Sequence, residues 1–282
     1  MVGGSYGLEL ISGCNKPSEC YERMDDHLRG IKLVYDNFFS HYNNYVSTRV
    51  KRGGHRDSCA QSPYVVLAFH DAGKAIYQDS LRSRCTAPLH EIASAAIALR
   101  ICDGILCERC MATVTLSILL HHHVMRPPNV LASELRREGY LEEFRRRVQA
   151  GGAYIDRYIE MAARIFGFQQ RFRSGGLHEY LKGLEGVKNV LNRFIELSRA
   201  SIKPDLRRGF LEIYRDALIL LQPLIAGDIA SARIQRRPPC KGLKLSDLET
   251  LNEPLLKDVI GDAGKRVRFA AAFGGKAIEL NG

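Results

Sequence analysis

Residues 69–75 read Phe69-His70-Asp71-Ala72-Gly73-Lys74-Ala75 and follow directly on an apolar run that begins at Gln61. The apolar run predicts a buried helix, and Gly73 suits the point at which such a helix stops. An imidazole and a carboxylate therefore stand side by side at a helix end. Because helix ends in a bundle can converge on one pocket, this stretch predicts a helical fold around a polar site.

The helical pattern continues on both sides of this stretch. Apolar residues recur with a helical period in the segments 25–46, 61–69, 87–102, 109–123, 130–148, 153–166, 179–199 and 205–232. We expect Pro223 to break or kink the last of these helices, because proline lacks the N–H that a helix interior needs. The sequence thus predicts an all-α protein, a helical bundle.

A domain boundary is indicated where Pro238-Pro239 follows Arg236-Arg237. We expect one domain over residues 1–237 and a small C-terminal appendage over residues 238–282, unless the appendage belongs to the same domain. Residues 266–269 and 277–280 are compatible with short strands or with a frayed helix. No internal repeat marks any other division of the chain.

Composition favours some partners and excludes others. The formal net charge is +10 over 282 residues, which favours a polyanionic partner, although many basic proteins bind no nucleic acid. No apolar stretch approaches the roughly 20 residues that span a bilayer, and residues 1–20 do not resemble a signal peptide. We therefore expect a cytoplasmic protein that does not bind membranes. The lone C-x-x-C at Cys107 and Cys110 favours buried thiols or a local disulfide over a zinc site.

Histidines are concentrated at the predicted helix ends. His70 and Asp71 follow one helix, His90 lies in the first turn of the next, and His121-His122-His123 close a third. Neutral imidazole binds Mn, Fe, Co, Ni or Zn, and a carboxylate can bridge two ions. Three successive histidines could also be a surface feature, and adjacent helical residues point about 100° apart, so at most two of the three can face one pocket.

Five segments, in chain order, resemble the motifs of the HD superfamily of metal-dependent phosphohydrolases. Residues 69–75 resemble its HD-x-G-K motif, and His90-Glu91-Ile92-Ala93-Ser94-Ala95 resembles the H-E-x-x-S-A motif that follows it. Residues 118–123 resemble the L-H-H motif of the CRISPR-associated branch. Asp26-His27-Leu28 stands where that family has its first histidine ligand, and residues 226–232, which contain Asp228, resemble its final aspartate motif.

The resemblance implies a site with two metal positions. One position would comprise His27, His70, Asp71 and Asp228, and the other His90, His121 and His122, with Asp71 bridging. Lys74 would act in catalysis by holding a phosphate oxygen, and Ser231 and His123 would support the site. Asp205 and Asp216 are rivals for the role of Asp228. The implied cofactor is a pair of divalent ions, Mn, Ni, Co or Fe, with Mg also possible. Two ions about 3.5–4 Å apart can clamp both the attacking and the leaving oxygen of a phosphodiester.

The function implied is a nuclease that hydrolyses single-stranded DNA in CRISPR interference. No P-loop is present, so no nucleotide cofactor is expected, and the helicase would be a separate subunit working with the CRISPR RNA-guided complex. One alternative is an HD phosphohydrolase acting on nucleotides or cyclic nucleotides. Another is an interaction subunit with a vestigial site.

A basic cluster offers a surface for the proposed DNA. Arg145, Arg146 and Arg147 are consecutive on a predicted amphipathic helix, although such runs also occur on simple solvated faces. Single strands are held by basic grooves together with stacked aromatic rings. Candidates for stacking are Tyr77, Tyr140 and Phe144.

Overall fold

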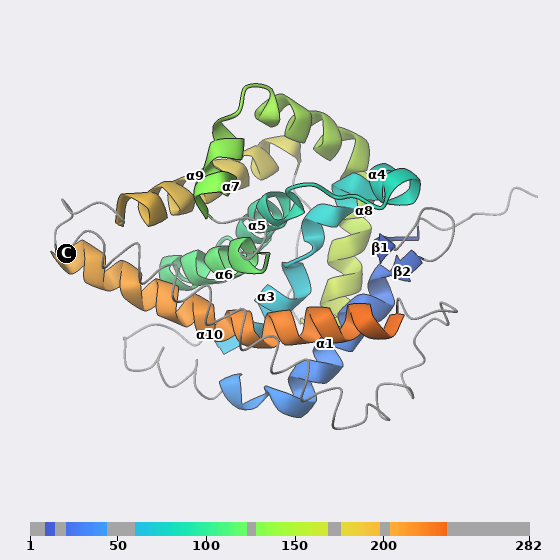
Figure 1. Ribbon diagram of the computed structural model, residues 1–282, viewed down its shortest axis with the longest axis horizontal. Helices are drawn as coiled ribbons and strands as arrows, with labels where there is room; N and C mark the ends of the chain where they lie inside the picture. The colour runs from blue at the N-terminus through green and yellow to red at the C-terminus, as the bar shows by residue number, and fades with distance from the viewer. Residues whose placement is uncertain are drawn as a thin grey trace, which may run out of the picture.

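The chain forms a bundle of α-helices, and this confirms the predicted fold class (Figure 1). The computed structural model describes residues 9–14, 21–43, 60–122, 128–168, 176–197 and 204–235. Within these ranges the elements are β1 (Ile11–Cys14), β2 (Tyr21–Arg23), α1 (Met24–Phe38), α3 (Ser62–Phe69), the 3-10 helix η2 (Ala72–Tyr77), α4 (Gln78–Arg84), α5 (His90–Ile101), α6 (Glu108–Leu120), α7 (Pro128–Arg136), α8 (Tyr140–Phe166), α9 (Leu177–Leu197) and α10 (Pro204–Gln235).

Helix α3 lies at the centre of the bundle. All its residues except Tyr64 are buried, and it contacts α1, α5, α6, α8 and α10. A short helix that is apolar on all its faces is stable only when other elements surround it. Because α3 ends at Phe69, its C-terminal end carries His70 and Asp71 into the middle of the fold.

Helices α1 and α10 approach each other closely, because two glycines lie between them. A Cβ atom at Gly30 would lie 2.8 Å from Oγ of Ser231, and one at Gly227 would lie 3.1 Å from the side chain of Ile31. The Ser231 hydroxyl donates a hydrogen bond to the carbonyl oxygen of His27, over 3.2 Å. Figure 1 shows the result, with the later half of α10 crossing in front of α1.

Gly73 allows η2 to pack directly on the first turn of α5. A Cβ atom at Gly73 would lie 2.2 Å from the carbonyl oxygen of His90, which no real side chain could tolerate. The Gly73 N–H also donates a hydrogen bond to Oγ of Ser94, over 2.8 Å. We expected this glycine to stop the preceding helix, but α3 already ends at Phe69. Its role is to bring the segment that carries Asp71 against α5.

An N-terminal hairpin, which the sequence pattern did not reveal, is fastened to the bundle through α4. Strands β1 and β2 are antiparallel. The side chain of Gln78 accepts a hydrogen bond from the N–H of Ile11 and donates one to its carbonyl oxygen, over 2.8 and 3.0 Å. A disulfide joins Cys14 at the end of β1 to Cys85 after α4. The hairpin therefore has a fixed position beside α4 and α1.

One expected boundary was wrong, and Pro223 does not break its helix. We expected a break between residues 148 and 153, but α8 continues through Gly151 and Gly152, and the break falls at Gly139, which has φ +85°. Helix α10 continues past Pro223. Buried leucines stand on both sides of this proline, at 220, 221 and 224, so packing offsets the hydrogen bond that it removes.

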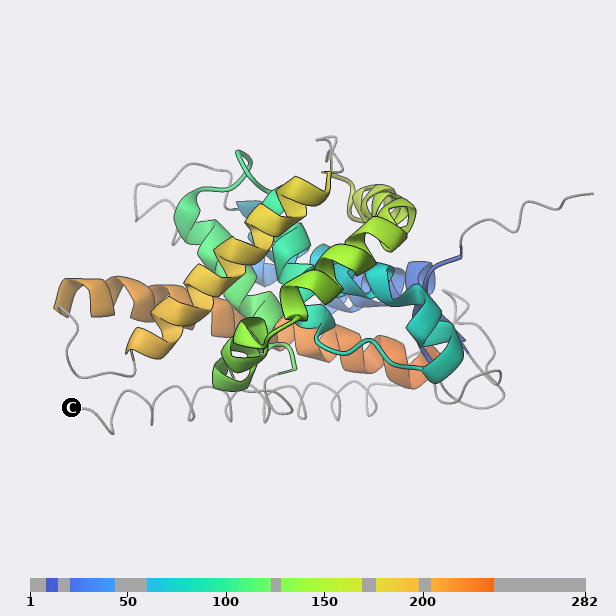
Figure 2. The same ribbon diagram turned by 90° about the horizontal axis from the view of Figure 1, so that it is seen from above.

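Helix α9 lies across α5, as the view from above shows (Figure 2). Gly183 permits this contact, since a Cβ atom there would lie 2.2 Å from the carbonyl oxygen of Ala96. Helix α5 is thus held between α9 and η2. The expected C-terminal appendage, residues 238–282, lies outside the described residues.

Candidate metal centre

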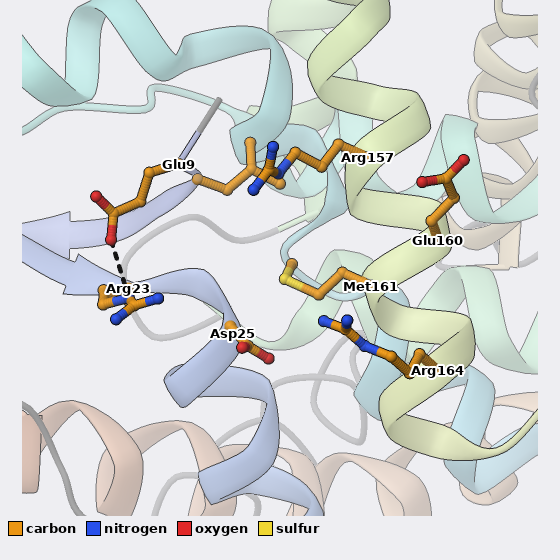
Figure 3. Close-up of a pocket in the computed structure, with 8 residues that line it drawn as sticks. Glu9, Arg23, Asp25, Arg157, Glu160, Met161 and Arg164 are labelled. Atoms are coloured by element: carbon orange, nitrogen blue, oxygen red, sulfur yellow. Dashed lines mark ion pairs between the residues drawn. The ribbon is translucent and has the colours of Figure 1, made fainter. Parts of the chain in front are cut away.

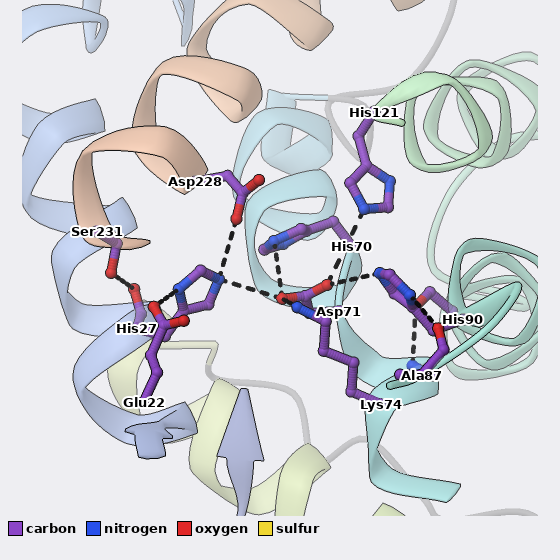
Figure 4. Close-up of polar contacts among 12 residues, drawn as sticks. Glu22, His27, His70, Asp71, Lys74, Ala87, His90, His121, Asp228 and Ser231 are labelled. Atoms are coloured by element: carbon purple, nitrogen blue, oxygen red, sulfur yellow. Dashed lines mark hydrogen bonds and ion pairs between the residues drawn. The ribbon is translucent and has the colours of Figure 1, made fainter. Parts of the chain in front are cut away.

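Side chains from several helix ends converge on one polar cluster inside the bundle (Figure 4). They come from α1, from the turn after α3, from the start of α5, from the turn after α6, and from α10. The cluster contains His27, His70, Asp71, His90, His121, His122 and Asp228. Except for Asp228 and His122, which are half-buried, all of them are buried.

These residues form two groups of potential ligands. His27, His70, Asp71 and Asp228 form the first, and His90, His121 and His122 form the second. Within each group, one ligand atom from every residue lies within 4.8 Å of all the others. The structure therefore brings together the same two sets that the resemblance implies, and the role of each residue as a ligand stays a prediction.

Asp71 lies between the two groups and turns one carboxylate oxygen to each. Its Oδ2 atom lies 3.1 Å from Nε2 of His27 and 3.4 Å from Nε2 of His70. Its Oδ1 atom lies 3.1 Å from Nε2 of His90 and 4.0 Å from Nε2 of His121. This position is the one that a bridging carboxylate requires.

Three of the histidine rings are oriented in the same way by the backbone. In each, the Nδ1–H donates a hydrogen bond to the carbonyl oxygen three residues earlier: His70 to Leu67, His90 to Ala87 and His121 to Ile118. A carbonyl can only accept, so the proton of the neutral ring is on Nδ1. The lone pair of Nε2 is then directed into the cluster, as metal ligation requires.

Several buried atoms of the cluster lack a hydrogen bond. Among the described residues these include Nε2 of His27, His70 and His121 and Oδ1 of Asp71. A buried polar atom without a partner is costly, so natural proteins rarely leave several in one place. Nitrogen and oxygen lone pairs that converge in this way fit a divalent metal ion, which would satisfy them together.

The pKa values of the histidine rings in the cluster are shifted in different directions. Burial lowers the pKa of His70 to about 4, and burial and the neighbouring rings lower the pKa of His121 and of His122. Although burial opposes charge on His27 as well, the carboxylates of Glu22 and Asp71 raise its pKa to about 9. Burial thus keeps the rings of His70, His121 and His122 neutral, whereas the ring of His27 is basic.

The charge of Asp71 is also fixed. Burial opposes ionisation, but the positive charge of Lys74 and the neighbouring histidines hold the pKa of this carboxyl well below its usual range. Nζ of Lys74 lies 2.6 Å from Oδ2 of Asp71. Asp71 is therefore a carboxylate, the form that binds cations, throughout the physiological range of pH.

The supporting residues occupy different places. Lys74 is buried beside Asp71 at the centre of the cluster (Figure 4). Ser231 stands outside both groups of potential ligands and holds the backbone of His27 to α10. Of the rival aspartates, Asp216 pairs with Arg109 over 2.9 Å and stands outside both ligand groups. His123 and the side chain of Asp205 lie outside the described part of the structure.

Sequence reasoning missed one residue that touches the cluster. Glu22, in strand β2, is completely buried, and its Oε1 atom lies 2.7 Å from Nδ1 of His27. The hairpin that carries it gives only a short strand signal, and five residues separate it from His27. No helical or strand spacing in the sequence connects the two.

The prediction that aromatic residues near the arginines stack on DNA bases was wrong. Tyr77, Tyr140 and Phe144 are buried in the core and cannot stack on bases. Of the three consecutive arginines on α8, Arg145 pairs with Glu142, and Arg147 pairs with Glu143 and lies over the ring of Tyr77. Arg146 is exposed. Two of the three arginines are thus engaged within their own helix.

A separate pocket of about 440 Å³ lies between α8 and the N-terminal hairpin (Figure 3). Charges of both signs line it: Arg157 and Arg164 on α8 extend toward Arg23 and Asp25, and Glu160 also lines the pocket. It includes none of the clustered histidines. Its balanced charges do not favour an anionic or a cationic ligand.

Fold and site together define an all-α protein with a buried histidine and aspartate cluster that could hold metal ions, an arrangement compatible with an HD-type hydrolase. No family model matches the chain, and neither a curated protein nor a solved structure is significantly similar to it. None of the helices in the described ranges has the length and apolar character that crossing a bilayer demands.

Proposed function

We propose that the protein is a metal-dependent phosphodiesterase whose centre holds two divalent ions. The observation that carries this proposal is the position of Asp71, which turns one oxygen to each of two groups of ligand atoms. Two ions with a shared carboxylate supply Lewis-acid activation of water and of the phosphoryl group. No serine or cysteine nucleophile is then needed.

The protein's own residues would orient the substrate and balance its charge. Lys74 carries three N–H donors and has no lone pair, so it serves as a cationic donor and not as a ligand. Its Nζ atom beside Asp71 is placed to hold a non-bridging phosphate oxygen as negative charge develops there. We expect the substrate to enter beside Asp228 or His122, because these two members of the cluster are half-buried and the others are buried.

The donor set favours transition metals. The first group offers two imidazoles and two carboxylates, and the second offers three imidazoles. Imidazole suits Fe, Co and Ni, and the carboxylates of the first group suit Mn, whereas Mg prefers a shell of oxygen ligands and retains its water. We therefore propose Mn, Fe, Co or Ni as the native metal, with Mg as the alternative at the first position.

Single-stranded DNA is the substrate that we propose, in CRISPR interference alongside a separate helicase subunit and the RNA-guided complex. The ordered motifs from His27 to Ser231, with their L-H-H segment, support this assignment, and so does the net charge of +10. A stacked duplex fits poorly into a site formed by helix ends. The helicase would therefore supply the single strand.

A phosphohydrolase acting on nucleotides or cyclic nucleotides is the second candidate. One observation favours it: the expected DNA surface on α8 lacks its aromatic part, and Arg145 and Arg147 already have acidic partners. Both candidate functions use the same metal chemistry. They differ in whether the substrate is a polynucleotide or a single nucleotide, and a comparison of these substrates can therefore distinguish them.

The deciding experiment compares substrates on one preparation of metal-loaded protein. One oligonucleotide, single-stranded and annealed, is incubated at low and high salt with Mn²⁺, Co²⁺, Ni²⁺ or Mg²⁺, beside a panel of nucleotides and cyclic nucleotides. For the nuclease we expect cleavage of the single strand, with affinity falling at a log–log salt slope of about −0.7 per contacted phosphate. Turnover of nucleotides alone would establish the second candidate, and no hydrolysis with any metal would overturn both.

A further inference from the structure

Glu22 stands behind His27, on the side away from the other ligands (Figure 4). In strand β2 the side chains of Tyr21 and Arg23 are exposed, and that of Glu22 points inward, as strand alternation requires. Its exposed fraction is 0%, and Oε1 lies 2.7 Å from Nδ1 of His27. Burial of a carboxylate is costly unless a hydrogen bond or an opposite charge compensates for it. Strand β2 thus places a buried carboxylate, whose desolvation needs a compensating partner, against the ring of His27.

His27 differs from the other oriented rings in what holds its Nδ1 atom. His70, His90 and His121 each donate to the carbonyl three residues earlier, and these rings stand at helix ends. At such ends some carbonyls have no partner within the helix. His27 lies inside α1, where the carbonyl three residues earlier is already bonded to the N–H of residue 28. Its Nδ1 atom therefore needs an acceptor from another element, and Glu22 provides it.

We propose that Glu22 is a positioning residue, which holds the His27 ring with Nε2 facing the first ligand group and thereby strengthens metal binding there. A carboxylate behind a ligating imidazole fixes the tautomer and makes the ring a better donor. Neither effect requires Glu22 to touch the metal or the substrate. This inference rests on the proposed function, because it assigns a role toward the same metal centre.

The test is a titration of the metal-free protein with Co²⁺ alone, followed by calorimetry and visible absorption. Glu22→Gln keeps the length and an acceptor oxygen but removes the charge, and Glu22→Ala removes both. We expect metal affinity to fall about 10-fold for Glu22→Gln and about 100-fold for Glu22→Ala, the range found for such partners. The melting temperature of each metal-free variant shows whether it is folded.

Glu91→Gln is the matched control. Glu91 is also fully buried, and its Oε2 atom lies 3.7 Å from Nδ1 of His90, but that ring already donates to Ala87 over 2.8 Å. Removal of this charge should leave Co²⁺ affinity within about 3-fold of the wild-type value, well short of the loss of an orienting partner. Equal losses in Glu22→Gln and Glu91→Gln would mean that only charge matters, and would overturn the positioning role.

A second measurement does not depend on folding of the variants. In wild-type protein loaded with Zn²⁺, nitrogen NMR reports which ring atom of His27 binds the metal. We expect Nε2 bound and Nδ1 protonated and slow to exchange; metal on Nδ1 would overturn the proposal. Failure of the wild-type protein to bind any metal would instead refute the proposed function, so the two failures are distinguishable.

Discussion

Oδ1 of Asp71 lies 3.1 Å from Nε2 of His90, across the boundary between the two ligand groups. Because the other oxygen of Asp71 faces the first group, Asp71→Asn should weaken both metal positions at once. We expect a loss of hydrolysis greater than about 100-fold, beyond the upper range for residues outside the ligand shell. Elemental analysis and a phosphodiesterase assay provide the measurement.

Asp216→Asn is the control for this change, since Asp216 pairs with Arg109 away from the cluster. It should retain metal and turnover. Full activity in Asp71→Asn protein, stripped with chelator and reloaded with Mn²⁺, would refute the bridging role of Asp71.

Lys74→Met should slow hydrolysis by about 100-fold, the loss seen when one donor to developing charge is removed. Metal content should not change, because lysine is not a ligand. Lys32→Met is a matched control, as Lys32 forms an ion pair with Asp36 on α1 outside both ligand groups. If metal is lost from Lys74→Met, then the lysine supports Asp71 and does not assist the reaction.

Gly73→Ala should destabilise the fold by about 3 kcal/mol, at the upper end of the cost of overpacking. The added Cβ would meet the carbonyl of His90 at 2.2 Å, and backbone cannot move aside as a side chain can. Gly152→Ala on α8 meets nothing within 4 Å and should stabilise by about 0.5–1 kcal/mol. Urea denaturation of the two variants and the wild type measures both effects, and similar stabilities for Gly73→Ala and wild type would contradict the packing role.

Removal of the disulfide should lower the free energy of unfolding by about 4 kcal/mol. Cys14 and Cys85 are 71 residues apart, so the bond restricts a long loop in the unfolded chain. The double variant Cys14→Ser/Cys85→Ser should melt at a lower temperature than the oxidised wild-type protein. A variant as stable as oxidised wild type would show that the bond adds nothing, and the free energies of unfolding decide between the two outcomes.

The polar cluster was predictable because its residues stand at helix ends. Periodicity locates helix ends to within a few residues, and histidines at several successive ends indicate one shared pocket. This reasoning identified His70, Asp71 and His90 from local sequence. His27 and Asp228 required the resemblance, since the sequence does not show that Gly30 and Gly227 let α1 and α10 approach closely.

Other features depend on contacts between distant segments and could not be read from local patterns. Glu22 is one acidic residue in a three-residue strand, and only the folded hairpin brings it to His27. The aromatic residues near the arginines suggested a stacking surface, yet Tyr140 and Phe144 form the inner face of α8. Periodicity alone did not assign these rings to the buried face.

The hydrogen-bond acceptors that orient the histidine rings differ in how far they depend on the amino acid present. At positions 67, 87 and 118 the supporting atom is a main-chain oxygen, which every amino acid supplies, so a codon change there leaves the acceptor in place. The support of His27 is a side chain at position 22, and a single nucleotide change can remove it. Of the four rings, His27 is therefore the one whose orientation depends on the identity of a neighbouring side chain and not on the main chain.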